Sequence, residues 1–183
     1  MNIPYRIVPQ PVGAHTVFAM TSRVLILMRH GKSAYPTGVE DHDRPLAPRG
    51  QREAALAGDW LRKSQPTIDG VLCSTSVRTR QTLAATGIDA PTRFDERLYG
   101  ASPHQVIDLI HGVDDSVSTL LIVGHAPGMP WTTWELASNR SSRQAEDVSK
   151  KFPTSAMAVL EFDQSWIDMD TGLAELMTFH IPR

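Results

Sequence analysis

Residues 24–28 (VLILM) and 120–123 (LLIV) form two short runs in which every side chain is apolar. A strand with one exposed face would alternate apolar and polar residues, so uninterrupted runs of this length indicate strands buried on both faces. Further strands are predicted at 71–73, 157–162 and 175–180. A chain built on such strands needs a layer of helices on each side of its sheet.

Segments with helical character alternate with these strands. Apolar residues recur at helical spacing within 51–63, and Gly, Pro and Ser signals delimit further helices at 77–86, 103–111 and about 129–138. The alternation predicts fold class α/β, as a three-layer α/β/α sandwich with a mostly parallel central sheet. Trp131 and Trp134, at i and i+3 of the last helix, are assigned to the core by default, with the edge of a pocket as the alternative.

The 183 residues suffice for one compact domain and leave little room for a second. We expect an irregular, proline-punctuated leader over 1–22 and a single domain over 23–183. A net charge of −2 and the lack of a long apolar stretch give no sign of nucleic-acid or membrane partners. The single cysteine, Cys73, excludes internal disulfides, fits a cytoplasmic location and is expected to serve as a packing residue.

The tripeptide Arg29-His30-Gly31 directly follows the first apolar run. Gly31 permits a sharp turn, so Arg29 and His30 are expected at the carboxyl end of a strand, where open α/β sheets bind ligands. Arginine is a permanent, bidentate phosphate ligand, and a neutral imidazole is a nitrogen nucleophile. The tripeptide therefore indicates a site that receives a phosphoryl group.

Three distant segments place further polar residues after predicted strands or extended stretches. They contain Arg78, Glu96 and His125. A parallel sheet would bring such positions to one edge despite their separation along the chain. Two histidines and two arginines gathered there would form a pocket for a tetrahedral dianion, in which the guanidinium groups supply the positive charge.

The segments that carry these residues resemble the histidine phosphatase superfamily, which shares its fold with phosphoglycerate mutases. Within that superfamily, residues 25–33 (LILMRHGKS) and 44–46 (RPL) are similar to the small SixA-type phosphohistidine phosphatase branch. Residues 74–82 (STSVRTRQT), 123–127 (VGHAP) and 152–154 (FPT) are similar to it as well. The resemblance extends from about residue 24 to the C-terminus and implies a phosphoglycerate mutase-like fold.

The resemblance implies that His30 is transiently phosphorylated and that Arg29, Arg78 and His125 form the phosphate pocket, with no metal or cofactor. Flanking guanidiniums are expected to lower the pKa of His30 and keep its imidazole neutral. A backbone carbonyl near the turn is expected to hold the proton of one ring nitrogen, which leaves the other as the nucleophile. His125 is expected to donate a hydrogen bond, as imidazole or as imidazolium.

Three assignments remain open at this point. Glu96 resembles the proton-donating carboxylate of the mutases, but the small branch does not clearly use such an acid. Pairing of Glu96 with Arg97 or a neighbouring basic residue is the alternative. Arg44 is a candidate phosphate contact, because the matching Arg-Pro-Leu loop lies over the pocket in that branch. Residues 41–43 (DHD) contain metal-ligand types, but adjacent residues cannot easily all face one ion, so a solvated loop is favoured.

These observations predict a metal-independent phosphatase that hydrolyses phosphomonoesters or phosphoramidates, protein phosphohistidine among them, through a covalent intermediate on His30. A phosphoglycerate mutase-like phosphotransferase and a catalytically silent phosphate-binding module are the alternatives. The expected partner is a phosphorylated protein or small molecule. The oligomeric state is left open.

Overall fold

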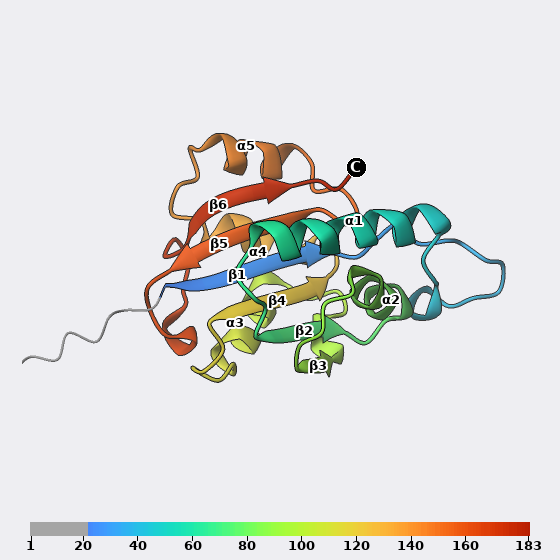
Figure 1. The fold of residues 1–183 in the computed structure, drawn as a ribbon, viewed down its shortest axis with the longest axis horizontal. Helices are drawn as coiled ribbons and strands as arrows, with labels where there is room; N and C mark the ends of the chain where they lie inside the picture. The colour runs from blue at the N-terminus through green and yellow to red at the C-terminus, as the bar shows by residue number, and fades with distance from the viewer. Residues whose placement is uncertain (1–21) are drawn as a thin grey trace, which may run out of the picture.

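The computed structural model describes residues 22–183, so the predicted leader lies outside the described residues except for its last position. A central six-stranded sheet is covered by helices on both sides (Figure 1). Its strands are β1 (Arg23–Arg29), β2 (Gly70–Ser74), β3 (Thr92–Asp95), β4 (Thr119–Gly124), β5 (Met157–Phe162) and β6 (Glu175–His180). The helices are α1 (Pro48–Ser64), α2 (Val77–Thr86), α3 (Pro103–His111), α4 (Gly128–Leu136) and α5 (Arg143–Lys150). Three short 3-10 turns are η1 (Asp41–Asp43), η2 (Glu96–Leu98) and η3 (Trp166–Asp168).

The strand order is β3-β2-β4-β1-β5-β6. Strands β1 to β4 run parallel, whereas β5 and β6 are antiparallel to their neighbours. The prediction of an α/β fold with a mostly parallel sheet is therefore confirmed. In the register of β1 and β4, Arg29 pairs with Gly124. The residues that follow these two strands, His30 and His125, consequently leave the sheet side by side.

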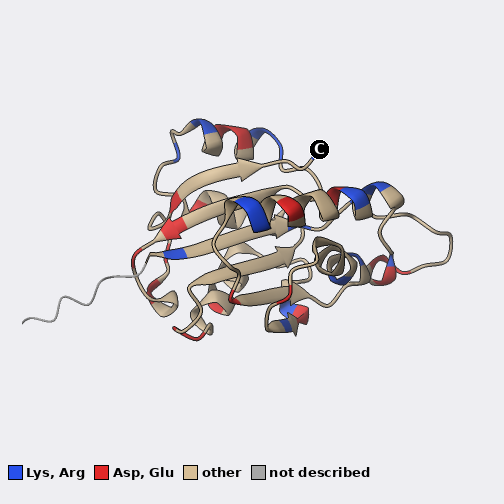
Figure 2. Ribbon diagram, in the orientation of Figure 1, with Lys and Arg blue, Asp and Glu red and all other residues tan. Residues whose placement is uncertain are grey.

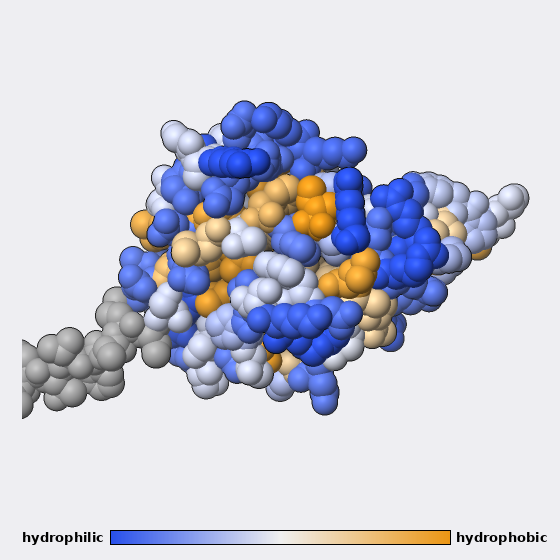
Figure 3. Space-filling model, turned by 45° about the horizontal axis from the view of Figure 1, so that its top comes forward, coloured by the Kyte–Doolittle hydropathy of each residue, from blue (hydrophilic) through white to orange (hydrophobic). Residues whose placement is uncertain are grey.

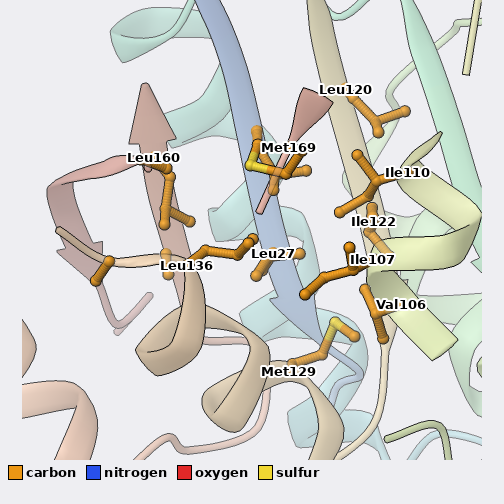
Figure 4. Close-up of a cluster of buried hydrophobic side chains, with 14 of the residues drawn as sticks. Leu27, Val106, Ile107, Ile110, Leu120, Ile122, Met129, Leu136, Leu160 and Met169 are labelled. Carbon is orange, nitrogen blue, oxygen red and sulfur yellow. The ribbon is translucent and has the colours of Figure 1, made fainter. Parts of the chain in front are cut away.

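The two faces of the sheet carry separate apolar clusters, which explains the uninterrupted apolar runs. On one face, Ile26 and Met28 of β1 cluster with Ala57 and Leu61 of α1. On the other face, Leu27 of β1 packs in a cluster with residues of α3 and α4 (Figure 4). The labelled members of that second cluster include Val106, Ile107, Ile110, Met129 and Leu136. Successive residues of each buried strand thus serve opposite layers.

Two elements were not expected from the sequence, and one helix begins earlier than predicted. The exposed edge strand β3 and the polar helix α5 lack the apolar patterns of the other elements, since α5 buries only Ala145 and Val148. Helix α1 begins at Pro48 rather than 51, because proline is well accommodated in a first helical turn. Gly50 lies in that turn, where a Cβ would be 2.2 Å from the carbonyl oxygen of Lys32.

Two helices of the described surface carry residues of both charges. Acidic and basic residues are interspersed along α1 and α5 (Figure 2), and hydrophobic residues appear between hydrophilic ones on the face shown in Figure 3. Cys73 is fully buried in β2, and burial raises the pKa of its thiol to about 12, so it acts as a packing residue as expected. Within residues 22–183, no helix is long and apolar enough to cross a membrane.

Candidate active site

The backbone of the turn after β1 is held by hydrogen bonds to the neighbouring strand β4 and to helix α2. The backbone N–H of His30 donates to the carbonyl of Gly124 at 3.0 Å. The N–H of Gly31 donates to Thr82 Oγ1 of α2 at 2.9 Å. Gly31 has no positive φ, but a Cβ at this position would be 2.8 Å from the carbonyl oxygen of Gly50. Glycine is therefore required for close approach of α1 rather than for the sharp turn that the sequence suggested.

The imidazole of His30 is oriented as a nucleophile. Its Nδ1 lies 2.7 Å from the carbonyl oxygen of Gly31, which can only accept, so Nδ1 carries the proton and Nε2 has a free lone pair. Burial, chiefly, and the nearby charges of Arg78, Arg29 and Arg44 lower the pKa of His30 to about 4. The imidazole is therefore neutral at pH 7. This geometry agrees with the carbonyl-held tautomer that the sequence predicts.

His125 follows β4 and lies beside His30, with 5.1 Å between the ring centroids. Its Nδ1 accepts a long hydrogen bond of 3.4 Å from Arg78 Nη2, so its Nε2 carries the proton and donates to Ser74 Oγ at 2.9 Å. Burial, followed by the influence of His30 and Arg78, lowers the pKa of His125 to about 3. These contacts favour the neutral imidazole in the site without a bound anion, and an imidazolium facing a bound phosphoryl group stays a prediction.

Asp41 joins two of the predicted phosphate ligands. Its carboxylate accepts from Arg78 Nη2 at 2.9 Å and from Arg44 Nη1 at 2.8 Å. Its backbone carbonyl accepts a second hydrogen bond from Arg78, and the hydroxyl of Tyr99 donates to Oδ2 at 2.5 Å. The hydrogen bond from Tyr99, then the two guanidiniums, hold the pKa of Asp41 below its usual range. The sequence favours a solvated loop here and misses this ionised bridge.

The three arginines next to His30 carry more positive charge than the single carboxylate of Asp41 balances. Arg29 Nη1 donates to the carbonyl of Phe152 at 2.8 Å, and Arg44 Nη2 donates to Ser33 Oγ. Each of the three guanidiniums also has a buried Nε with no hydrogen-bond partner among the described residues. Buried donors without acceptors are costly, and an anionic oxygen is the acceptor that suits them. The cluster is therefore chemically suited to bind a phosphoryl dianion.

The structure brings Glu96 into no interaction with this cluster. Glu96 is the exposed first residue of η2, and its side chain has no hydrogen bond or ion pair to any described residue. Arg97 pairs with Asp95 at 2.6 Å instead, so the pairing considered for Glu96 does not form. Its role as a proton donor stays a prediction. No group of three His, Cys, Asp or Glu side chains within residues 22–183 is arranged to hold a metal ion.

Besides Asp41, two more residues of the site were not identified from the sequence. Ser74 ends β2 and accepts from His125, and Tyr99 lies edge-on to the same ring at a centroid distance of 5.2 Å. The position of Ser74 at the carboxyl end of a buried strand could have identified it as a site residue. Tyr99 contacts Asp41, which lies 58 positions earlier in the chain. No local sequence pattern indicates a contact over that separation.

The chain is similar to known proteins over most of its length. Residues 25–102 match the model of the histidine phosphatase superfamily, branch 1. The uncharacterized protein Rv1276c of Mycobacterium tuberculosis is 58% identical over 158 residues, which cover 85% of this chain and all of that protein. Phosphohistidine phosphatase SixA of Escherichia coli is 28% identical over 148 residues, covering 77% of this chain and 86% of that protein.

A solved structure of a protein assigned as phosphohistidine phosphatase SixA, from Nakamurella multipartitia, superposes with a TM-score of 0.82. It is 41% identical, and the match covers 88% of this chain and 96% of that chain. The fold and the site together define a phosphatase. The chain belongs to the histidine phosphatase superfamily and is similar to its SixA branch.

Proposed function

We propose that the protein hydrolyses phosphorylated substrates through a phosphohistidine intermediate on His30, and that protein phosphohistidine is among its substrates. One observation carries the proposal most directly. The Gly31 carbonyl fixes the proton of His30 on Nδ1, which leaves a neutral Nε2 among three guanidinium groups. A nucleophile that is uncharged at pH 7 and surrounded by fixed positive charge is suited to attack a phosphoryl group.

In the first step, Nε2 of His30 attacks phosphorus and the bond from phosphorus to the leaving nitrogen or oxygen breaks. The leaving atom takes up a proton from solvent water, and the phosphoryl group is then held on Nε2. Arg29, Arg44 and Arg78 stabilise its equatorial oxygens, and His125 donates its N–H to an oxygen in place of Ser74. In the second step, water attacks phosphorus, releases inorganic phosphate and restores the lone pair of His30.

A phosphohistidine leaving group needs little help from a protein acid, because the departing imidazole is readily protonated. This suits a site in which Glu96 is exposed and does not contact the histidines. Similarity to phosphohistidine phosphatase SixA of Escherichia coli supports the same substrate class. A phosphomonoester demands a better proton donor, so we expect slower turnover of alkyl esters.

A substrate panel tests the proposal. Phosphate release is measured with a phosphohistidine peptide, free phosphoramidate, p-nitrophenyl phosphate and 3-phosphoglycerate, each with and without EDTA. We expect the phosphohistidine peptide to be turned over most efficiently and EDTA to have no effect. Phosphoryl transfer between glycerate positions without phosphate release would instead indicate a mutase, and binding of vanadate without any turnover would indicate a silent module.

A further inference from the structure

A groove of about 690 Å³ lies between α4 and α5, directly beside the active site. Two of its lining residues, Ala126 and Pro127, follow His125 in the chain. Another, Phe152, supplies the carbonyl to which Arg29 donates. Whatever occupies this groove is therefore adjacent to a phosphoryl group bound at His30.

Trp131 and Trp134 line this groove from one side of α4. Their side chains are 62% and 38% exposed, whereas Met129, Thr132 and Leu136 of the same helix are buried. The two indoles therefore lie at the edge of a pocket rather than in the core, which was the default assignment. Exposed aromatic pairs beside a site are costly in water and are typical anchors for a partner.

The groove also has a basic end. Lys150 pairs with Glu146 of α5 at 2.6 Å, whereas the neighbouring Lys151 has no ion pair among the described residues. Both lysines line the groove, together with one acidic residue, Glu135. Lys151 directly precedes Phe152, so its backbone lies beside the carbonyl to which Arg29 donates. An acidic side chain next to the phosphorylated residue of a substrate complements this end.

We propose that this groove is the docking surface for a phosphorylated polypeptide substrate. The segment that carries the phosphorylated residue places an apolar side chain against Trp131 and Trp134 and an acidic side chain on Lys151. The inference rests on the proposed function and deepens it. Continuity between the groove and the phosphate pocket favours a polypeptide, because neighbouring residues of one chain can fill both at once. An open surface between two helices accommodates such a chain.

Two phosphohistidine peptides of equal length test this proposal, one with leucine and aspartate beside the phosphohistidine and one with serine at both positions. Phosphoramidate is the small substrate without neighbouring residues. We expect wild-type protein to prefer the first peptide over the second by roughly 10-fold or more in kcat/KM. The double variant Trp131→Ala/Trp134→Ala loses this preference mainly through a higher KM, and Lys151→Glu loses the part that depends on aspartate. Turnover of phosphoramidate changes less than about 2-fold in both.

Ile167→Ala is the matched control, because Ile167 is 63% exposed in η3 and does not line the groove. It is expected to keep the full peptide preference. Binding of the leucine-aspartate peptide to His30→Ala protein, followed by indole fluorescence, provides a second measurement should the double variant be unstable. A change in fluorescence on binding supports docking at the indoles, and binding without such a change overturns it.

The outcomes separate this inference from the proposed function. Absence of any peptide preference in active wild-type protein overturns the docking surface and leaves the phosphatase proposal intact. Equal losses on the peptides and on phosphoramidate in the tryptophan variant also overturn it, because the groove would then support the phosphate pocket itself. No phosphate release from any substrate by wild-type protein would instead contradict the proposed function.

Discussion

The chemistry of the site depends on two histidines that are buried without charge. His30 lies at the end of β1 with a pKa of about 4, and His125 lies at the end of β4 with a pKa of about 3. In both, loss of hydration is the main cause, and nearby arginines add to it. An imidazole that stays neutral over the whole physiological range remains a nucleophile without a separate base to deprotonate it.

The ionisation of His30 can be measured directly by NMR. We expect its ring Cε1–H resonance to titrate with a midpoint near pH 4, well below the 6.5 of an unperturbed histidine. The titration is recorded without substrate, so it is free of the ionisation near pH 6 that a phosphorylated substrate would add to a pH profile of activity. A midpoint between 6 and 7 would show that the imidazole is hydrated and largely charged under mildly acidic conditions.

Asp41 positions two of the arginines in the site. Because it binds both Arg44 and Arg78, it fixes the two guanidiniums relative to each other. We expect Asp41→Asn to weaken inhibition by vanadate about 10-fold and to raise KM, since hydrogen bonds to charged groups contribute about 1.5–3 kcal/mol.

The control is Asp43→Asn, because among the described residues the carboxylate of Asp43 pairs with His42 alone and is mostly exposed. This variant should be inhibited by vanadate as strongly as the wild-type protein and should turn over substrate with the same KM. Tighter binding of vanadate by Asp41→Asn would contradict the positioning role, since it would mean that the carboxylate competes with the anion for the arginines.

At the scale of elements, α1 is pressed against both the catalytic turn and α2. A Cβ on Gly50 would be 2.2 Å from the Lys32 carbonyl oxygen, and a Cβ on Gly58 would be 1.9 Å from that of Thr86. Backbone lies on both sides of each contact, so the elements themselves must move to admit a side chain. The first contact supports the turn that carries His30, and the second lies at the far end of α2.

Alanine at these two glycines should therefore separate stability from activity. We expect Gly50→Ala and Gly58→Ala each to lower the free energy of unfolding by about 1–3 kcal/mol, as overpacking does. Only Gly50→Ala should also reduce kcat/KM, because it displaces the Lys32 backbone beside His30. Arg52→Ala, at an exposed position of α1, serves as the control. Its free energy of unfolding should stay within about 0.5 kcal/mol of the wild-type value. Unchanged kcat/KM in a folded Gly50→Ala protein would contradict the proposed support of the turn.

The elements and residues that the sequence predicts are those with a local signal. Apolar runs identify β1 and β4, and capping residues give the bounds of α2 and α3. Arg29 ends β1, His30 and His125 directly follow β1 and β4, and Arg78 lies in the first turn of α2 after β2. Parallel topology suffices to gather positions of this kind. Asp41 reaches Arg78 across 37 positions from the short turn η1, and only the folded chain reveals that contact. Helix α5 has too few apolar residues to be distinguished from a polar loop.

At the scale of the whole molecule, the uncharged histidines couple folding to pH. Both have folded pKa values below the 6.5 of the unfolded chain, so the unfolded state binds more protons below that pH. Their contribution to stability is fully present above about pH 6.5 and is lost as pH falls toward 4. The same burial that makes the nucleophile therefore makes the fold sensitive to acid.

This coupling predicts the slope of a stability profile. Between pH 6.5 and 4, the free energy of unfolding should fall by about 1.4 kcal/mol per pH unit for each histidine. Urea denaturation at several pH values measures this, and the double variant His30→Gln/His125→Gln should show a shallower slope. Parallel profiles for the two proteins would show that the histidines are charged in the folded state.

The central claim is that His30 Nε2 carries the phosphoryl group. Acid-quenched mass spectrometry is unsuitable because phosphohistidine is labile in acid, so ³¹P NMR and alkaline-stabilised peptide mapping are used after rapid mixing with phosphoramidate. We predict one phosphoryl group per chain, on His30 and bonded to Nε2, that disappears in His30→Ala together with turnover. A phosphoryl group on His125, or undiminished turnover by His30→Ala, would contradict the account.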